Sequence, residues 1–270
     1  TLAELAGLRL LPGPVLDGLS LAPVLRGEGT VPEDRTLCVN YSRMPGGTDY
    51  PTPDAASVMR IEGAAVLWKR WRLIEGTALY DLDTDPGQAR DVAAEHPDVV
   101  RLLRARLEAW WRDVEPVANQ VQRVVIGSDA ENPMTLSACE WRDVFVDQQR
   151  QVRVAERKNG YWHLQVARAG TYTFELRRWP RESGLTLRQA CPAARLFDGD
   201  LAEGVALPIA RARILVARQR QAVDLTPADD AATFNVHLDA GPTLLHTWFD
   251  DDRGQPLCGA YYVGVERQGP

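Results

Sequence analysis

The chain has 270 residues, of which 45% are hydrophobic and 25% are charged, the balance of a globular protein with one large or two ordinary domains. No run approaches the roughly 18 apolar residues of a membrane-spanning helix, and the formal net charge of -6 argues against broad nucleic-acid binding through phosphate neutralisation. The 4 cysteines form no CxxC pair, so neither a zinc site nor a dense disulfide framework is indicated. They are Cys38, Cys139, Cys191 and Cys258.

Positive charge is concentrated in the segment 150–188. This segment holds nine basic and three acidic side chains, a local charge of +6 that leaves the rest of the chain at -12. Charged side chains on strands are usually solvated surface, but a basic face would also attract an anionic substrate. The sequence leaves both interpretations open.

The chain begins with the pattern of an amphipathic helix that stops at Gly7, "TLAELAGL", and has no upstream start signal. Thr1 in place of methionine indicates that the beginning of the protein lies upstream, together with any signal peptide. The stretch "DGLSLAPVLRGEG", residues 17–29, predicts a turn and a short helix. A strand candidate, "TLCVNYS", and a loop of turn-forming residues, "PGGTDYPTPD", follow.

A four-stranded meander is predicted next, because short apolar runs alternate with Glu-Gly turns at 62–63 and 75–76. Its strands lie near residues 57–61, 64–68, 71–75 and 78–82. From Pro97 to Val114 apolar residues recur at helical spacing. We expect this helix to lie across the small sheet and to bury one of its faces.

Three aspartates alternate in "LYDLDTDPGQARDV": Asp81, Asp83 and Asp85. A calcium loop of the helix-loop-helix kind needs glycine at its sixth position and a bidentate glutamate at its twelfth. Those positions hold Pro86 and Val92. The stretch is therefore interpreted as a strand, a Pro-Gly turn and the approach to a helix.

Beyond a connector at 116–134, which includes one strand candidate, the sequence is rich in strands. Three strands are predicted between residues 151 and 180, separated by an Asn-Gly hairpin signal at 158–160 and by Ala-Gly at 169–170. Further strands are predicted near 207–217, 221–225, 232–238, 243–249 and 258–266. Eight or so short strands without a long helix between them predict a sandwich.

The predicted fold class is α+β: a small four-stranded antiparallel sheet covered by a carboxy-terminal helix, followed by an all-β sandwich-like domain. The corresponding domains are residues 1–115, the connector 116–134, and residues 135–270. Alternation is clearest at residues 172–177, where Tyr172, Phe174 and Leu176 share one face of a strand.

Few residues are candidates for catalysis. The 4 histidines are isolated, and a histidine within a strand is more often packed or on the surface than a ligand. None lies near a cysteine or serine in a nucleophile motif, and no glycine-rich phosphate loop is present. We therefore assign no catalytic residue and no metal ligand. The histidines are His96, His163, His237 and His246.

The stretch "WKRWRLIEGTALYDLDTDPGQARDVAAEHPDVVRLLRARLEAWW", residues 68–111, resembles the carboxy-terminal subdomain of the sulfatases, the sulfuric-ester hydrolases that include the arylsulfatases. In that family a strand bearing "WK" is followed by "LYDL", an acidic turn with "DP", and a helix that closes a small sheet. "TLAELAGL" and "DGLSLAPVLRG" resemble the helix and linking motif that precede this subdomain. The resemblance covers residues 1–115. "YTFELRRWP" and "GAYYVGVER" are similar to a strand-rich extension of some bacterial sulfatases.

The resemblance implies an enzyme that uses calcium and a formylglycine made from the Cys or Ser of a CxPxR or SxPxR motif. Neither can be assigned to this chain, so both are expected in a missing amino-terminal catalytic domain, and the segment alone is predicted to be inactive. "CPAAR", Cys191 to Arg195, has its proline one position too early and lies far from the amino terminus. Cys191 is therefore interpreted as a buried or loop cysteine.

Five basic residues are candidates for binding a sulfated substrate. Two of them, Lys69 and Arg72, lie on the predicted meander, where they can equally well be solvated residues at the ends of strands. The other three, Arg177, Arg178 and Arg181, surround Trp179, and a guanidinium group can bind two sulfate oxygens at once. The candidates are Lys69, Arg72, Arg177, Arg178 and Arg181.

The tryptophans of the second part present a similar choice. An exposed ring can stack on a sugar, but tryptophan in a sandwich usually contributes its large area to the core. The core interpretation is favoured for each of them. They are Trp141, Trp162, Trp179 and Trp248.

We expect the chain to be the carboxy-terminal part of an arylsulfatase-like enzyme acting on sulfated aryl or carbohydrate substrates, periplasmic or secreted if its parent is a typical bacterial sulfatase. Its partners would be the catalytic domain and a sulfated small molecule or glycan, with no nucleic acid and no membrane span. The alternative is a non-catalytic carbohydrate-binding β-sandwich module. A third option is a structural fragment with no present activity.

Overall fold

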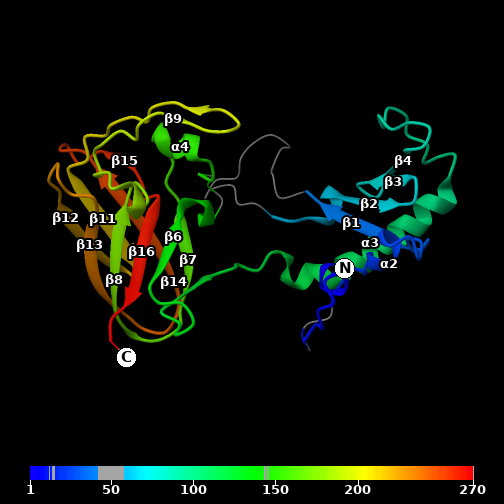
Figure 1. The fold of residues 1–270 in the computed structure, drawn as a ribbon, viewed down its shortest axis with the longest axis horizontal. Coiled ribbons are helices and arrows are strands. Elements are labelled where there is room, and N and C mark those ends of the chain that lie inside the picture. The colour runs from blue at the N-terminus through cyan, green and yellow to red at the C-terminus, as the bar shows by residue number, and fades with distance from the viewer. Residues whose placement is uncertain (12, 14–15, 42–57, 143, 145, 270) are drawn as a thin grey trace. The chain divides into compact units, whose positions relative to one another are not determined.

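β-strands dominate the structure, which contains several sheets and few helices (Figure 1). The computed structural model describes residues 1–11, 13, 16–41, 58–142, 144 and 146–269. They fall into two compact units, one formed by residues 1–41 and 59–118 and the other by residue 58 and the described residues of 119–269. Within the described part of the chain, no helix combines the length and the apolar character needed to cross a membrane.

The first unit is built on a four-stranded antiparallel sheet in the order β1-β2-β3-β4. Helix α3 (Pro97–Ala118) packs on one face of this sheet, where its Leu103 and Leu107 share a buried core with Val66 and Leu73. The strands are β1 (Thr36–Asn40), β2 (Ala64–Trp68), β3 (Trp71–Ile74) and β4 (Ala78–Asp81).

The edge strand of this sheet differs from the prediction. The strand predicted at 57–61 is wrong for its described residues, because 58–60 are irregular and Ile61–Gly63 forms a 3-10 helix, η1. Residue 57 and the loop predicted at 45–54 lie outside the described residues. β1 takes the edge position instead and pairs with β2, so that Cys38 lies opposite Val66.

The acidic stretch after β4 forms a backbone turn. Asp81 Oδ1 accepts a hydrogen bond from the Asp83 N–H at 3.1 Å, and Asp85 Oδ2 accepts one from the Arg90 N–H at 2.9 Å. These carboxylates therefore bond to nearby backbone and do not converge on a common point. In the described part of the chain, no group of three or more His, Cys, Asp or Glu side chains could hold a metal ion.

The second unit is a β-sandwich of two sheets (Figure 1). The larger sheet has the order β12-β11-β14-β7-β5, with β15 also paired to β14, and the smaller has the order β13-β8-β16-β6. The strands of the larger sheet are β5 (Val124–Ile126), β7 (Tyr161–Val166), β11 (Arg211–Val216), β12 (Gln219–Asp224), β14 (Gly241–Asp250) and β15 (Pro256–Cys258). Those of the smaller are β6 (Met134–Ser137), β8 (Gly170–Arg177), β13 (Ala232–Leu238) and β16 (Tyr262–Arg267).

Alternate residues of both sheets point into one core. Tyr172, Phe174 and Leu176 of β8 are fully buried, as the alternation predicts, and share the core with Trp162 and Leu164 of β7. Removing this apolar area from water stabilises the unit by about 25 cal/mol per Å². The sandwich predicted for this part of the chain is therefore present.

Two short segments differ from the predicted strands. The segment that begins "QVRV" is mostly helical, because residues 149–153 form helix α4 (Gln149–Arg153). The predicted hairpin signal at 158–160 joins this helix to β7, and Asn159 Nδ2 donates to the Thr247 carbonyl at 2.8 Å. Within the predicted connector, β5 is an edge strand that pairs parallel with β7.

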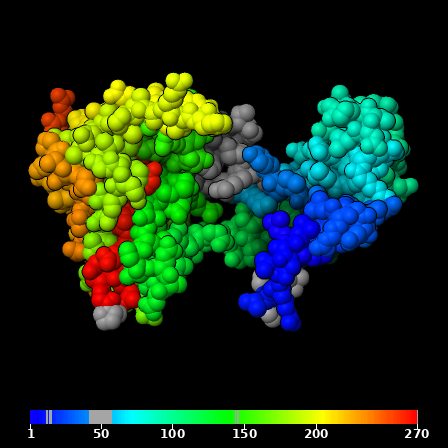
Figure 2. Space-filling model, in the orientation of Figure 1, coloured from blue at the N-terminus to red at the C-terminus, as the bar shows by residue number. Residues whose placement is uncertain are grey.

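Residues 178–210 form a long excursion, drawn largely in yellow over one end of the second unit (Figure 2). Buried arginines bind its carbonyl groups. Arg153 Nη1 donates to the carbonyls of Pro192 and Ala202 at 2.7 and 2.8 Å. The remaining short elements are α1 (Leu2–Leu5), α2 (Ala22–Leu25), η2 (Ala138–Glu140), η3 (Arg181–Ser183), β9 (Ala194–Arg195) and β10 (Asp200–Leu201).

Candidate functional site

A row of aromatic rings lies on the outer face of the larger sheet. His163 and Tyr161 of β7 have ring centroids 5.4 Å apart, and Tyr161 lies 5.9 Å from His246 of β14. His246 in turn lies 4.0 Å from Trp248. We call these four residues, His163, Tyr161, His246 and Trp248, the aromatic strip.

Strand alternation places the strip outside the core. Leu245, Thr247 and Phe249 of β14 are fully buried, so His246 and Trp248 between them project from the opposite face and are only partly buried. The same rule holds on β7, where Trp162 and Leu164 are buried and the strip residues face outward. The rings therefore belong to the surface of the sheet.

An ion pair fixes the position of Trp248. Arg213 of β11 lies directly opposite Trp248, and its guanidinium carbon is 4.7 Å from the centre of the Trp248 ring. The same guanidinium donates to both carboxylate oxygens of Asp250, at 2.5 and 2.8 Å, and Asp250 is 2% exposed. The bond to Asp250 raises the pKa of Arg213 above its usual value. Such bidentate pairing is geometrically specific, so it holds the cation in place beside the ring.

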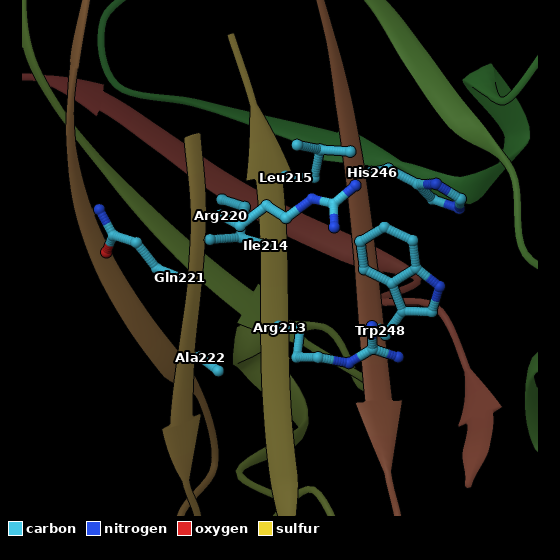
Figure 3. A pocket seen from close by; sticks show the side chains of 8 residues that line it. All are labelled: Arg213, Ile214, Leu215, Arg220, Gln221, Ala222, His246 and Trp248. Carbon is cyan, nitrogen blue, oxygen red and sulfur yellow. The ribbon is translucent and has the colours of Figure 1, made fainter. Parts of the chain in front are cut away.

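A hollow of about 390 Å³ lies beside Trp248 (Figure 3), within the size range of small-molecule sites. Its floor is formed by β11 and β12, and His246 and Trp248 form one wall. Figure 3 shows the Arg220 side chain crossing over β11 toward these two rings. The hollow is lined by Arg213, Ile214, Leu215, Arg220, Gln221, Ala222, His246 and Trp248.

His246 is uncharged in this environment. Burial, and secondarily the charge of Arg213, lower the pKa of His246 to about 4. Its Nε2 atom is buried and has no hydrogen-bond partner among the described residues. Near neutral pH the ring therefore extends the apolar surface of Trp248 instead of adding a charge to it.

The chemistry that this arrangement offers is stacking combined with hydrogen bonding. Partly exposed rings in fixed orientations bind flat apolar surfaces, while guanidinium and amide groups at their edge bind oxygen atoms. The residues that line the hollow include no serine, cysteine or carboxylate that could act as a nucleophile. The geometry supports binding of a ligand that has both an apolar face and many oxygens.

The candidates predicted on the meander are not brought to this hollow, and each has its own surroundings in the first unit. Lys69 Nζ forms an ion pair with Glu33 at 2.6 Å and lies over the Trp68 ring. Arg72 has a buried Nε without a partner among the described residues. Its side chain lies on the sheet face opposite to the one that packs on α3, since its neighbours Trp71 and Leu73 are buried.

The anion-facing patch predicted around Trp179 is corrected at Arg178. This residue is 0% exposed, donates to the carbonyls of Gln189 and Val205 at 3.3 and 2.6 Å, and stacks on Trp179. Its guanidinium therefore binds the long excursion and cannot face a ligand. Burial is also the main cause that lowers the pKa of Arg178.

The other two arginines of that patch are paired with acids. Arg177 Nη1 lies 2.8 Å from Asp230 Oδ2, and Arg177 also approaches Glu175 at 3.6 Å. Arg181 is exposed and forms an ion pair with Glu175 as well. Most of the basic side chains in the segment 150–188 therefore form bonds within the protein, and only some of them are solvated surface.

The sequence identified the core tryptophans better than the surface one. Trp141, Trp162 and Trp179 are 2%, 0% and 4% exposed, which confirms the core interpretation for them. For Trp248 the core interpretation is wrong. Cys191 is half-buried and its carbonyl accepts a bond from the Gly204 N–H, consistent with a loop cysteine.

No model of a known protein family matches the sequence, and no curated protein matches it either. Among solved structures, the chain is similar to a CBM35 from Cellvibrio japonicus Abf62, at 12% identity and a TM-score of 0.30, over 49% of this chain and 91% of the other. It is also similar to a ruminal GH26 endo-beta-1,4-mannanase, at 12% identity and a TM-score of 0.28, over 52% of this chain and 27% of the other. At these TM-scores neither likeness bears on fold or function.

The role of Arg178 yields a stability prediction. Arg178→Met keeps an apolar stem on Trp179 but leaves two carbonyls of the excursion without donors. It should lower the free energy of unfolding by about 2 to 4 kcal/mol. Arg181→Met, which breaks an exposed ion pair three residues away, should cost less than about 1 kcal/mol. Urea denaturation followed by tryptophan fluorescence measures both, and equal losses would contradict the structural role of Arg178.

The pKa of His246 yields a second prediction. Its folded value, about 4, lies below the ordinary value of 6.5, so between these pH values the unfolded chain binds a proton that the folded chain does not. Acidification from pH 6.5 toward 4 should therefore destabilise the protein through this residue. His246→Phe should show a weaker loss over the same window in urea unfolding. Parallel profiles, or an ordinary His246 pKa by NMR titration, would be inconsistent with the burial described.

Proposed function

We propose that the second unit is a non-catalytic carbohydrate-binding module that holds sugar rings against the aromatic strip. A sugar ring combines an apolar C–H face with hydroxyl groups around its edge. Burying that face on an indole removes apolar area from water, and the hydroxyls remain free to bond polar side chains at the rim. Trp248, His246 and the guanidinium groups of Arg213 and Arg220 supply both kinds of contact.

The observation that carries this proposal is the fixed orientation of an outward-facing tryptophan. A mobile surface ring would lose rotamer freedom on binding a sugar, and that entropy cost would reduce affinity. The Trp248 ring packs against the guanidinium of Arg213 at 4.7 Å and against the His246 ring at 4.0 Å, and Arg213 is itself bonded to Asp250. The ring is therefore already restricted in the free protein, and binding of a sugar costs less side-chain entropy.

The strip also favours a chain of sugars over a single one. Its four rings extend across two neighbouring strands, from His163 to Trp248, in consecutive steps of 5.4, 5.9 and 4.0 Å. Such an open row offers stacking positions to successive units of an oligosaccharide. We therefore expect longer oligosaccharides to bind more tightly than monosaccharides.

The test is the loss of glycan binding on removal of the Trp248 ring. Trp248→Ala should weaken binding of the chain to its best oligosaccharide at least about tenfold, because central aromatic contacts dominate interface energies. Affinity electrophoresis against galactans, mannans, xylans and cellulose fragments, followed by calorimetry, identifies that ligand.

The matched control is Phe197→Ala. Phe197 is fully exposed on the long excursion and lies outside the hollow, so its loss should leave glycan affinity unchanged. Circular dichroism checks that both variants remain folded. If no polysaccharide in the panel binds, or if Trp248→Ala binds as the unaltered chain does, the proposed function is wrong.

A second candidate function rests on the first unit: the chain would be the carboxy-terminal part of a sulfate-ester hydrolase, as the sulfatase resemblance implies. Eleven large aliphatic side chains among the described residues of the first 40 are strongly exposed. Exposed apolar surface of this extent is typical of an interface. A catalytic domain that carries the formylglycine and calcium would cover it. The exposed residues are Leu2, Leu5, Leu8, Leu10, Leu11, Leu16, Leu19, Leu25, Val31, Leu37 and Val39.

The second candidate can be tested on the face of β1 that is turned away from α3. Leu37 and Val39 are 48% and 52% exposed, while Cys38 between them packs against the core under α3. Leu37→Ser with Val39→Ser should lower binding of an apolar fluorescent dye and reduce self-association without unfolding the unit. Val66→Ser on the buried side of the same sheet should unfold it. Unchanged dye binding in the double variant would remove this support for a docking face.

A further inference from the structure

Arg220 differs from the other arginines on the outer face of the larger sheet. Arg211 bonds Asp224 at 2.7 Å, and Arg213 bonds Asp250. Among the described residues, the side chain of Arg220 has no hydrogen bond, ion pair or ring contact. It is exposed on β12, and its side chain extends over β11 into the hollow (Figure 3).

The pairing of strands fixes where this guanidinium lies. Arg220 is opposite Leu215 on β11, and Leu215 is opposite His246 on β14. The next row holds Ala222, Arg213 and Trp248 in the same order. The hydrocarbon stem of Arg220 can therefore rest on Leu215 while its charge reaches the rim of the rings. The small side chain of Ala222 leaves the space beside it open.

The hollow has one uncompensated charge. Arg213 is neutralised by Asp250, which is itself almost fully buried, and His246 is neutral because burial lowers its pKa to about 4. Gln221 has no charge and donates its amide to the Asn235 carbonyl at 3.0 Å. Arg220 is therefore the cation that a ligand in this hollow meets.

Building on the carbohydrate-binding function proposed above, we propose that Arg220 makes the aromatic strip selective for glycans that carry an anionic group on a sugar beside Trp248. The anionic group is a uronate carboxylate or a sulfate ester. Both present oxygens that match the planar fork of a guanidinium, whereas a hydroxyl group does not. Because Arg220 forms no ion pair with an acidic side chain of the described residues, it can bind such a group without breaking an existing bond.

The anion-binding group is thus Arg220, and not the arginines around Trp179 that the sequence predicted. Arg177 and Arg181 are engaged with Asp230 and Glu175, and Arg178 is buried, so a sulfate or carboxylate would have to compete with bonds already formed. At Arg220 it would only displace water. The exposed position also predicts that added salt weakens binding of charged glycans more than binding of neutral ones.

The experiment compares three ligands on the whole chain by calorimetry: oligogalacturonate, a sulfated galactan oligosaccharide and an uncharged galactan oligosaccharide of equal length. The unaltered chain should bind at least one charged ligand about tenfold or more tightly than the uncharged one. Arg220→Gln should remove this preference and leave the uncharged ligand unaffected. Arg218→Gln, with the same loss of charge on the adjoining turn but outside the hollow, should behave as the unaltered chain does.

The outcomes separate this inference from the function on which it rests. Preference for the uronate alone or for the sulfate alone identifies the anionic group, and either supports the role of Arg220. Equal binding of charged and uncharged ligands, or a preference that survives Arg220→Gln, overturns that role while Trp248-dependent binding still stands. Absence of binding to all three overturns the role of Arg220 and leaves the binding face standing if a neutral glycan of the wider panel binds through Trp248. Absence of binding to that whole panel, or binding that Trp248→Ala leaves intact, overturns the binding face and the role of Arg220 together.

Discussion

The buried pair between Arg213 and Asp250 is the interaction on which the candidate site depends. Burying a carboxylate to 2% exposure is costly unless it is paired, and Arg213 pairs with Asp250 through two hydrogen bonds. The guanidinium is then fixed, and its central carbon lies 4.7 Å from the centre of the Trp248 ring. An outward-facing indole thereby acquires a defined orientation, and the charge of Arg213 also helps to keep His246 neutral. A single ion pair thus sets both the geometry and the polarity of the strip.

Arginine has a second, structural use in this sandwich. Arg153, Arg178 and Arg188 each donate to backbone carbonyl groups of the chain between residues 178 and 225. A long irregular segment contains many carbonyls that no strand can satisfy, and a guanidinium with five donors can bind several of them at once. The basic composition of residues 150–188 is therefore mainly a requirement of the fold. The cation best placed for a ligand, Arg220, lies outside that segment.

The sequence predicted those parts of the fold that depend on local patterns. Turn residues and alternation placed β2, β3, β4, β8 and β13 within a residue or two, because Gly-containing turns and buried alternate positions leave little freedom of register. Patterns failed where pairing is distant in sequence. β1 was not assigned to the sheet edge, since nothing local states that residues 36–40 pair with 64–68. The stretch "QVRV", residues 151–154, alternates as a strand would, yet residues 149–153 form α4.

The candidate site was beyond the reach of the same patterns. In "LLHTWFD" the residues alternate between two faces, but alternation does not state which face is buried. Hydrophobicity would place Trp248 inside and Thr247 outside, and the structure has the reverse. The reason is tertiary: the Thr247 hydroxyl accepts the Ala260 N–H within the core, while Trp248 has Arg213 as its cross-strand partner. Only the paired strands bring Arg220, Arg213 and Trp248 to one hollow.

The most direct measurement is a crystal structure of the chain with an acidic oligosaccharide bound. Our account predicts one sugar ring stacked on Trp248, neighbouring units along His246 and Tyr161, and the anionic group within hydrogen-bonding distance of the Arg220 guanidinium. A ligand bound at the loops that end the sandwich, with Trp248 left uncovered, would contradict it.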